Sequence, residues 1–348
     1  MTTISTKAAP PETGHPQPKE MAQGASSAAT PKDEYRAFCK RERTLPLFAR
    51  DWWLDAAVGP DGWDVALVKK GDVVAATMPY VLLKRYGMKI VTQPALTPVL
   101  GPWLRQLGGT TAAQLSSDKE LMQALIDQLP AFDHFAQTWH PSLTNWQPFF
   151  WNGFRQTTYY TYVLPDLTDT GKLWEGLDKK ARRAITRAET EHKLQIRDDL
   201  PIDALLELNR KTFARQGLPP PYPDEFVRRL DAACLERGCR KMFVAVDPDG
   251  VAHAGCYIVW DEDSAYGLIS GTDPAYRRSE ANSFCVWASI LHAAGVTRRY
   301  NFNGSMIEPF EAYLRTFGGD HVPYFHVSRT PSRLLTMRQG LLSLIGKK

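Results

Sequence analysis

Two stretches of the chain repeat one pattern of strands and turns, and this repetition constrains the fold more than any other feature. The first, residues 63–95 (WDVALVKKGDVVAATMPYVLLKRYGMKIVTQPA), has apolar runs separated by Lys-Gly-Asp and Tyr-Gly turns. The second, residues 241–274 (KMFVAVDPDGVAHAGCYIVWDEDSAYGLISGTDP), has Asp-Pro-Asp-Gly and acidic turns at the same points. Each stretch predicts a three-stranded antiparallel meander joined by hairpin turns.

The similarity continues after both meanders. Residues 132–164 and 300–327 each predict a strand, a helix that ends at glycine, and another strand. Gly153 corresponds to Gly319 in this comparison, and both are expected to end a helix with positive φ. Strand–turn–strand patterns also recur by chance, but the shared order of elements favours an α+β chain with two copies of one unit, offset by roughly 170 residues.

Composition and helical periodicity divide the rest of the chain. Residues 1–33 are rich in Pro, Ala, Ser, Thr and Gly, which predicts a disordered N-terminal tail. The two copies are expected to form domains at residues 34–165 and 166–330. The second domain opens with helices, which the apolar spacing places within residues 173–196, at 201–216 and at 224–237.

The last segment, residues 331–348 (PSRLLTMRQGLLSLIGKK), predicts a short basic amphipathic helix. Its leucines stand among arginines and lysines, which is typical of a contact with a membrane surface. Docking on the protein's own core would bury the same leucines, and the sequence leaves both alternatives open. No stretch approaches about 18 apolar residues, so we expect no membrane-spanning helix.

Overall composition excludes several classes of protein. Hydrophobic residues make up 43% and charged residues 23% of the chain, as in ordinary globular proteins, and the net charge of +4 is too small to favour a DNA partner.

The cysteines lack a second Cys or His pair at zinc-site spacing. We therefore expect free thiols, no metal site and a cytoplasmic location. The cysteines stand at positions 39, 234, 239, 256 and 285.

A basic cluster lies within the first of the three predicted helices. It consists of Lys179, Lys180, Arg182, Arg183 and Arg187. A solvated helix face has this composition, and so does an anion site, because Arg side chains match the geometry of phosphate. We assign Lys179, Arg182 and Arg183 to substrate binding.

A loop of small residues and arginines joins a predicted strand to the next helix, between Ser270 and Asn282. The free N–H groups and the dipole of a helix N-terminus favour an anion such as pyrophosphate. A simple side-chain N-cap by Ser279 or Asn282 is the alternative. The residues that we assign to donor binding are Ser270, Gly271, Thr272, Arg277, Arg278, Ser279, Ala281 and Asn282.

A polar elbow, Asn303-Gly304-Ser305, interrupts the strand pattern near Tyr300. Polar groups at the end of a strand suit substrate handling, so we assign the three elbow residues to substrate binding. The sequence contains no Gly-x-Ser-x-Gly elbow, no P-loop and no metal-binding histidine pair. Hydrolase and kinase functions therefore lose support.

The segments LWEGLDKKARRAITRAE, LISGTDPAYRRSEANSFCVWASILHAAGVTRRYNFNGS and EAYLRTFGG, in this order, resemble the FemAB-like branch of the GNAT acyltransferases. WWLDAA and MPYVLLKRYGMKIVTQPALTPVLGPW resemble the same branch, so the similarity covers about residues 44–330. The resemblance implies two tandem GNAT-like domains, each a mixed, mainly antiparallel sheet flanked by helices. Residues 277–282 match the pyrophosphate loop of the family, but Ser279-Glu280-Ala281 stand in place of its usual glycines.

The resemblance also implies the chemistry. An acyl or aminoacyl group passes from an acyl-CoA thioester, or from an aminoacyl-tRNA, to an amine, and no tightly bound cofactor is needed. GNAT strands separate near residues 270–272, where backbone N–H groups are expected to stabilise an oxyanion. We expect Asp273 or Glu308 to act as base and Tyr266 or Tyr313 as acid.

These observations favour a cytoplasmic acyl- or aminoacyltransferase that acts on an amino group of a phosphate-bearing cell-envelope glycan or peptide precursor. The C-terminal tail would add a weak contact at the inner face of the membrane. The competing class is a non-catalytic binding or scaffold protein built on degenerate GNAT domains. An RNA-binding protein that uses the basic helix is a weaker alternative, because the helix lacks interleaved aromatic residues that stack on bases.

Overall fold

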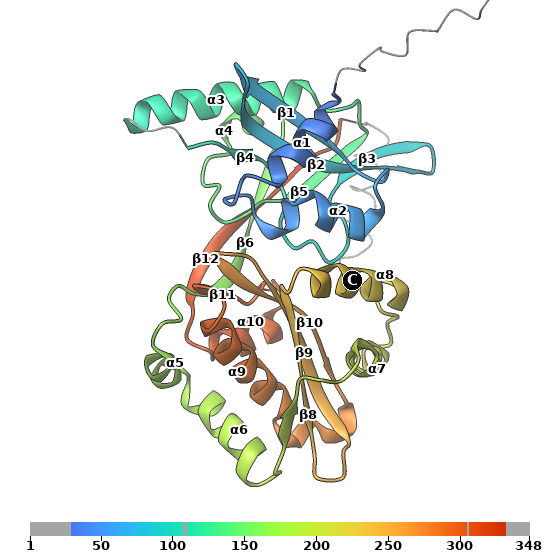
Figure 1. Cartoon of the computed structure of the whole chain (residues 1–348), viewed down its shortest axis with the longest axis vertical. Helices are drawn as coiled ribbons and strands as arrows, with labels where there is room; N and C mark the ends of the chain where they lie inside the picture. The colour runs from blue at the N-terminus through green and yellow to red at the C-terminus, as the bar shows by residue number, and fades with distance from the viewer. Residues whose placement is uncertain (1–28, 107–109, 305, 332–348) are drawn as a thin grey trace, which may run out of the picture.

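The computed structural model describes residues 29–106, 110–304 and 306–331. Ser305, the predicted C-terminal amphipathic helix and most of the predicted N-terminal tail therefore lie outside the described residues. The described chain forms two halves, one above the other in Figure 1. Strands β6 (Arg155–Leu164) and β12 (Asp320–Arg329) run between the halves.

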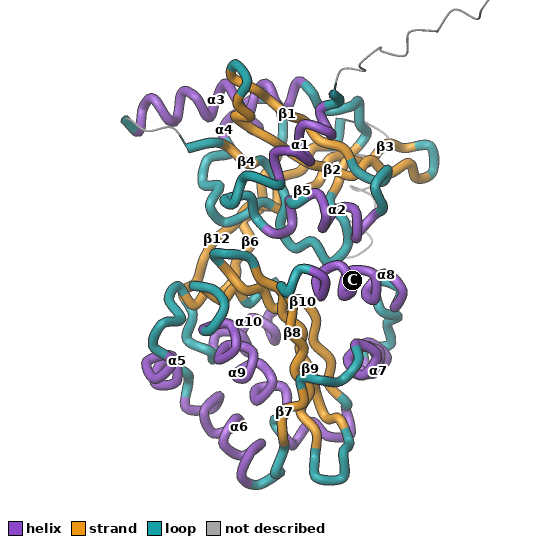
Figure 2. Tube along the Cα trace, viewed as in Figure 1, coloured by secondary structure: helices purple, strands orange, loops and turns teal. Residues whose placement is uncertain are grey.

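The N-terminal half contains α1 (Pro31–Cys39), the 3-10 helix η1 (Leu47–Ala49), α2 (Asp51–Val58), β1 (Asp64–Lys70), β2 (Val73–Arg85), β3 (Met88–Thr92), β4 (Trp103–Leu104), α3 (Thr111–Asp127), β5 (His134–Thr138) and α4 (Gln147–Trp151). The C-terminal half contains α5 (Thr170–Gly176), α6 (Lys179–Thr190), β7 (Gln195–Arg197), α7 (Ile202–Arg215), α8 (Asp224–Glu236), β8 (Arg240–Val246), β9 (Ala252–Trp260), β10 (Ser264–Thr272), η2 (Pro274–Ser279), α9 (Ala281–Ala294), β11 (Arg299–Asn301) and α10 (Glu308–Arg315). Helices α5, α6, α9 and α10 lie on one side of the C-terminal strands, and α7 and α8 lie on the other (Figure 2).

One sheet runs through both halves in the order β1-β2-β3-β5-β12-β6-β11-β10-β9-β8-β7, and β4 pairs with β2. Among the described strands, β3 with β5 and β10 with β11 are the parallel pairs, and the others are antiparallel. The predicted mixed, mainly antiparallel α+β fold is confirmed. The N-terminal meander (β1–β3) leads to parallel β5, as the C-terminal meander (β8–β10) leads to parallel β11, so both halves repeat one strand order.

The two halves exchange their last strands. Strand β12 pairs with β5 of the N-terminal half, where Val327 lies opposite Gln137. Strand β6 pairs with β11 of the C-terminal half, where Leu164 lies opposite Tyr300. Because β6 and β12 also pair with each other along nine positions, the exchange joins the halves into a continuous sheet. The predicted boundary between residues 165 and 166 divides the chain by sequence order. It assigns β6 to the first domain and β12 to the second, although β6 pairs with β11 of the C-terminal half and β12 with β5 of the N-terminal half.

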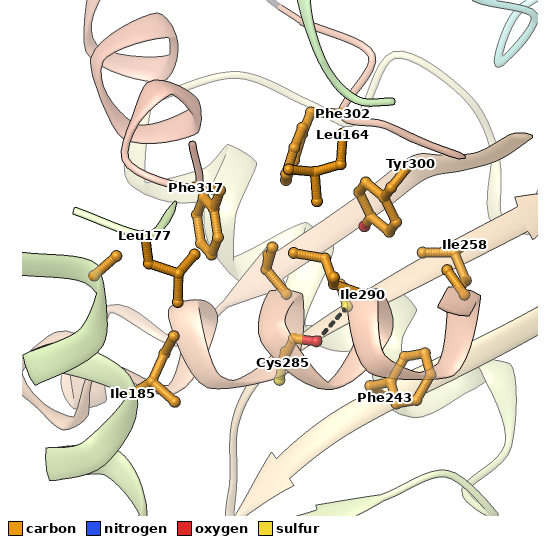
Figure 3. Packing of buried hydrophobic residues seen from close by; sticks show 14 of the residues in the cluster. Leu164, Leu177, Ile185, Phe243, Ile258, Cys285, Ile290, Tyr300, Phe302 and Phe317 are labelled. Atoms are coloured by element: carbon orange, nitrogen blue, oxygen red, sulfur yellow. Dashed lines mark hydrogen bonds between the residues drawn. The ribbon is translucent and has the colours of Figure 1, made fainter. Parts of the chain in front are cut away.

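The largest core of the C-terminal half surrounds α9. Figure 3 shows Leu177, Ile185 and Phe317 toward one end of this helix and Phe243 and Ile258 of the sheet toward the other. The predicted apolar stripe of α6 is buried here, from Ala181 to Ala188. Burial of each large aliphatic side chain stabilises the fold by roughly 1.5–3 kcal/mol, so this core fixes α9 relative to β10 and β11.

Two details of the predicted helices are wrong. The helix expected within residues 173–196 is two helices, because Asp178 accepts a hydrogen bond from the Lys180 N–H (2.7 Å) and begins α6 as its N-cap. The glycine that follows α10 with positive φ is Gly318 (φ 78°), and not Gly319. Gly153 has the expected positive φ (77°), so the chain turns at Gly153 and Gly318 in the two copies.

Helix α1 begins inside the predicted tail. Pro31 occupies its first turn, and Thr30 is the N-cap. The Thr30 hydroxyl accepts a hydrogen bond from the Asp33 N–H, and the Asp33 carboxylate accepts one from the Thr30 N–H. This capping box explains why a helix forms at the end of a segment that is otherwise poor in apolar residues.

Candidate active site

Strands β10 and β11 separate beside α9, and this separation is the centre of the candidate site. The parallel pairing runs from Ser264 opposite Arg299 to Tyr266 opposite Asn301. Strand β11 then ends, whereas β10 continues to Thr272 with an irregular register against β9 next to Gly267. Backbone groups of β10 beyond Tyr266 therefore lack a partner strand on the β11 side. This is the arrangement that the resemblance predicts near residues 270–272, although it begins earlier, at Gly267.

The elbow residue Asn303 bridges the separated strands. Its backbone has a left-handed conformation (φ 49°), and its N–H donates to the Asn301 side-chain oxygen at 2.9 Å. The Asn303 side-chain amide donates to the Gly267 carbonyl at 2.9 Å. The elbow thus lies at the point where β10 and β11 diverge, with its side-chain nitrogen directed at β10.

Gly304 connects the elbow to β6. Its N–H donates to the Thr161 hydroxyl at 2.8 Å, and the same hydroxyl donates to the Asn301 side chain at 2.8 Å. A Cβ at Gly304 would overlap the backbone of Tyr160 and Thr161, so the close approach requires glycine. The elbow therefore has a structural role in addition to its assigned role in substrate binding, while Ser305 lies outside the described residues.

Helix α7 holds the far end of β10. The Asn209 side chain donates to the Ser270 carbonyl (2.8 Å), and the Thr272 N–H donates to the Thr212 hydroxyl (2.8 Å). Gly271 allows this contact, because a Cβ there would overlap the α7 backbone. Because the Thr272 N–H already donates to the Thr212 hydroxyl, this N–H is not free to stabilise an oxyanion in this conformation.

The N-terminus of α9 has no side-chain cap. Glu280 precedes the helix in a left-handed conformation (φ 58°), and the Ser279 hydroxyl donates instead to the Tyr276 carbonyl at 2.7 Å. The alternative of an N-cap at Ser279 or Asn282 is therefore wrong. Arg277 and Arg278 are exposed in the same loop, so cationic side chains and the positive end of the helix dipole lie together, as phosphate binding requires.

The structure brings Tyr313 and Asn282 together. The Asn282 side-chain amide donates to the Tyr313 hydroxyl at 2.7 Å, which places that hydroxyl at the first turn of α9. Burial raises the pKa of Tyr313, so the hydroxyl keeps its proton at neutral pH. This hydroxyl lies beside the loop that we assign to donor binding, residues 270–282, which is called the donor loop below. A protonated hydroxyl at this place is suited to give a proton to a leaving group.

Tyr266 lies on the other side of the sheet. It is 1% exposed, its ring packs edge-on against Phe48 of the N-terminal half at 4.9 Å, and it belongs to the core beneath α7 and α8. Burial raises its pKa well above the usual value. Tyr266 and Tyr313 thus face opposite cores and cannot act at one reacting centre without a rearrangement of β10.

The two assigned bases have different surroundings. Glu308 begins α10 and is exposed, and its side chain makes no hydrogen bond or ion pair with the residues that the structure describes. Asp273 accepts a hydrogen bond from the Ala275 N–H (2.9 Å) and forms an ion pair with Lys211 (2.9 Å). The Ala275 N–H and then Lys211 hold the pKa of Asp273 below its usual value of 3.8. A carboxylate with a lowered pKa is a weak base, and Lys211 already occupies the Asp273 carboxylate, so Asp273 is poorly suited to that role.

We expect the ionised Asp273 side chain to make the stability of the protein depend on pH. Because its folded-state pKa is lowered, its contribution is complete above about pH 4 and is lost as pH falls through the lowered value. Thermal melting points of the wild type and the Asp273→Asn variant should therefore differ at pH 6 and converge as the pH falls through the lowered pKa of Asp273. A difference that stays constant over this range would contradict the assignment.

The assigned basic residues of α6 lie on the exposed face of that helix. Lys179 and Arg183 are exposed, and Arg182 donates to the Glu175 carbonyl at 3.1 Å. The pKa of Arg187 is raised, first by its hydrogen bond to Glu191 and to a lesser extent by Glu280. Helices α6 and α9 pack against each other, so the basic cluster and the donor loop belong to neighbouring elements.

Sequence reasoning missed four residues that shape this site: Thr161, Asn209, Lys211 and Thr212. Thr161 belongs to the exchanged strand β6, and the other three belong to α7. Each contacts the site through a residue at least 60 positions away in sequence. Nothing local distinguishes them from other polar residues, so no sequence signal was available.

Comparison with known proteins agrees with this geometry. Residues 176–310 match the family described as acetyltransferase (GNAT) domain, and no curated protein matches the chain. A crystal structure of FemX is similar at 12% identity, covering 88% of this chain and 97% of that chain with a TM-score of 0.60. The C-terminal domain (DUF2156) of a putative lysylphosphatidylglycerol synthetase from Agrobacterium fabrum is similar at 13% identity, with coverages of 89% and 96% and a TM-score of 0.51. L-PGS from Bacillus licheniformis is similar at 11% identity, with coverages of 94% and 100% and a TM-score of 0.51.

Residues 176–310 are therefore similar to an acetyltransferase (GNAT) domain. The described residues of the chain have the tandem GNAT fold of FemAB-like proteins, which confirms the resemblance at the level of fold. No helix in the described part of the chain is long and apolar enough to cross a membrane. Within the same residues, no group of three or more His, Cys, Asp or Glu side chains is placed to hold a metal ion.

Proposed function

We propose that the protein is an N-acyltransferase that uses a phosphate-bearing acyl donor, either an acyl-CoA or an aminoacyl-tRNA. The acceptor is an amino group of a phosphate-bearing cell-envelope precursor, which approaches from the side of the elbow and the basic face of α6. The main support is one junction: the gap between β10 and β11, the uncapped N-terminus of α9 and the Tyr313 hydroxyl lie together.

In this proposal the donor phosphates lie at the first turn of α9, close to Arg277 and Arg278. The acyl carbonyl then lies in the gap between the strands, where N–H groups of β10 beyond Tyr266 face no partner strand. The acceptor amine attacks that carbonyl after losing a proton to Glu308, and Tyr313 gives its proton to the leaving group. Lys179 and Arg183 of α6 attract the phosphate of the acceptor.

The envelope acceptor is supported by the kinds of protein that share the fold. A lysylphosphatidylglycerol synthetase, by its name, makes lysylphosphatidylglycerol, a phosphate-bearing lipid. The exposed cations of α6 and of the donor loop would suit both a phosphate-bearing donor and a phosphate-bearing acceptor. Peripheral contact with the membrane through residues 331–348 belongs to the same proposal.

A donor that binds should raise the thermal midpoint of the protein. At a ligand concentration of 100 times Kd the expected stabilisation is about 2.7 kcal/mol. The measurement is a thermal-shift series with acetyl-CoA, longer acyl-CoAs and aminoacyl-tRNA. We expect at least one donor to raise the midpoint, and the double variant Arg277→Gln/Arg278→Gln to lose most of the shift.

Arg298→Gln provides the matched control. It removes an exposed arginine before β11, at the opposite end of the parallel pair from the donor loop. Its shift with donor should equal that of the wild type. Equal loss in both variants would indicate a general charge effect and would contradict a site at α9.

A non-catalytic binding or scaffold protein remains the second candidate, because two observations favour it. The Asn303 amide bridges the gap at Gly267, and Glu280 places a negative charge at the N-terminus of α9. Under this alternative no donor shifts the midpoint and no acyl group reaches an amine.

A further inference from the structure

Two cysteines meet where α8 ends. The Gly238 N–H donates to the Leu235 carbonyl (3.0 Å), and the Cys239 N–H donates to the Cys234 carbonyl (3.1 Å). With Gly238 at positive φ (61°), these bonds form a Schellman motif, in which the side chains at the positions of Cys234 and Cys239 contact each other. The Cys239 thiol also donates to the Cys234 carbonyl at 3.6 Å.

The Cys239 side chain opens onto a cavity between the two halves. The cavity has a volume of about 290 Å³. Its wall includes Trp52 and Arg50 from the N-terminal half and Arg237 and Trp260 from the C-terminal half. The Arg237 guanidinium lies 4.5 Å from the centre of the Trp52 ring, and Arg50 forms an ion pair with Glu262. A half-buried cysteine thus lines a cavity whose wall carries two cations and two carboxylates, those of Asp261 and Glu262.

The surroundings distinguish this thiol from the other cysteines. The hydrogen bond with the Cys234 thiol is the largest cause that lowers the pKa of Cys239; burial opposes it, and Arg237 and Arg50 add smaller lowering effects. The same hydrogen bond and burial raise the pKa of Cys234. Burial and then Asp51 raise the pKa of Cys39 to about 12, and Cys256 and Cys285 are buried in the core around α9. Cys239 is therefore the thiol best placed to react as a thiolate.

We propose that Cys239 is a thiol–disulfide exchange site for low-molecular-weight disulfides of the glutathione type, with Cys234 as its resolving thiol. The Cys239 thiolate attacks one sulfur of oxidised glutathione, forming a mixed disulfide and releasing one glutathione thiolate. The Cys234 thiol gives its proton to that thiolate and attacks the Cys239 sulfur, which forms the Cys234–Cys239 disulfide and releases the second glutathione. Two protein thiols are oxidised and one disulfide is reduced to two thiols.

The test uses the reduced full-length protein, treated with oxidised glutathione, digested with trypsin and analysed without reduction. Cleavage after Arg229, Arg237 and Arg240 separates the two cysteines into the peptides LDAACLER and GCR. In the wild type we expect these two peptides joined by a disulfide. In the Cys234→Ser variant we expect glutathione to remain on Cys239, because no thiol resolves the adduct.

Cys39, which is also half-buried, is the internal control. In the Cys234→Ser variant the serine hydroxyl can still donate a hydrogen bond to Cys239, and Arg237 and Arg50 remain, so glutathione should be attached to Cys239 at least about ten times faster than to Cys39. Replacing Cys239 by Ser should leave Cys234 unmodified in the folded protein. The proposal is wrong if Cys39 reacts first, or if the joined peptides are missing from the wild type while the Cys234→Ser variant also lacks the adduct. Neither result depends on acyl transfer.

Discussion

Replacing Tyr313 by phenylalanine is expected to lower the rate of acyl transfer by about a hundredfold or more. The substitution removes the hydroxyl that Asn282 holds at the first turn of α9, together with the proton that it gives to the leaving group. The ring contact with Phe317 remains, so the fold should stay intact. The measurement is the steady-state rate of transfer from the donor that gives the largest thermal shift, together with the Kd of that donor.

Tyr266→Phe is the matched control for this prediction. It removes a hydroxyl of the same type from the same half of the protein, but on the opposite face of the sheet. We expect transfer rates within about twofold of the wild type, because this hydroxyl does not face the donor loop. A large loss of rate in Tyr266→Phe and none in Tyr313→Phe would contradict the assignment of the proton donor.

Replacing Gly271 by alanine is expected to destabilise the protein by about 3 kcal/mol. A Cβ at this position would lie less than 3.0 Å from backbone atoms of Leu208 and Asn209, and backbone atoms cannot move aside as a flexible side chain does. Helix α7 must therefore shift, which breaks the contacts of Asn209 and Thr212 with the end of β10. Chemical denaturation measures the change, and donor binding should weaken with it.

Gly176→Ala provides the control for crowding. A Cβ at Gly176 has no atom within 4 Å, and the residue ends helix α5. We expect this variant to be as stable as the wild type or slightly more stable, since alanine has the higher helix propensity. If both glycine variants unfold at the same denaturant concentration as the wild type, α7 does not hold β10 in the way described.

Local sequence patterns were sufficient to predict much of the fold. Turn residues and alternating apolar runs predicted both meanders, and the spacing of apolar residues predicted α7 and α8 almost to their ends. The exchange of β6 and β12 was not predictable in this way, because either strand fits beside β5 or β11 by local pattern. Which partner is chosen depends on contacts between residues more than 100 positions apart.

The elements around the candidate site were predictable from the sequence, whereas the directions of their side chains were not. A strand, a loop with arginines and a helix N-terminus are adjacent in sequence, so residues 270–282 were found from the pattern. The side of the sheet on which Tyr266 and Tyr313 lie depends on how α10 and the N-terminal half pack against the sheet. Local sequence patterns do not predict this packing. The elbow that we assigned to substrate binding also proved to have a packing role, because Gly304 contacts Thr161 from β6.

Titration of acetyl-CoA, a long-chain acyl-CoA and aminoacyl-tRNA into the wild type and the Glu280→Gln variant tests the central claim most directly. The claim is that donor phosphates bind at the N-terminus of α9, where Glu280 is the nearest negative charge in the loop. We predict that at least one donor binds the wild type and binds Glu280→Gln about three times more tightly, since a repulsive charge at the helix N-terminus is removed. Equal affinity of both proteins for a donor, or no binding of any donor to either protein, would contradict the account.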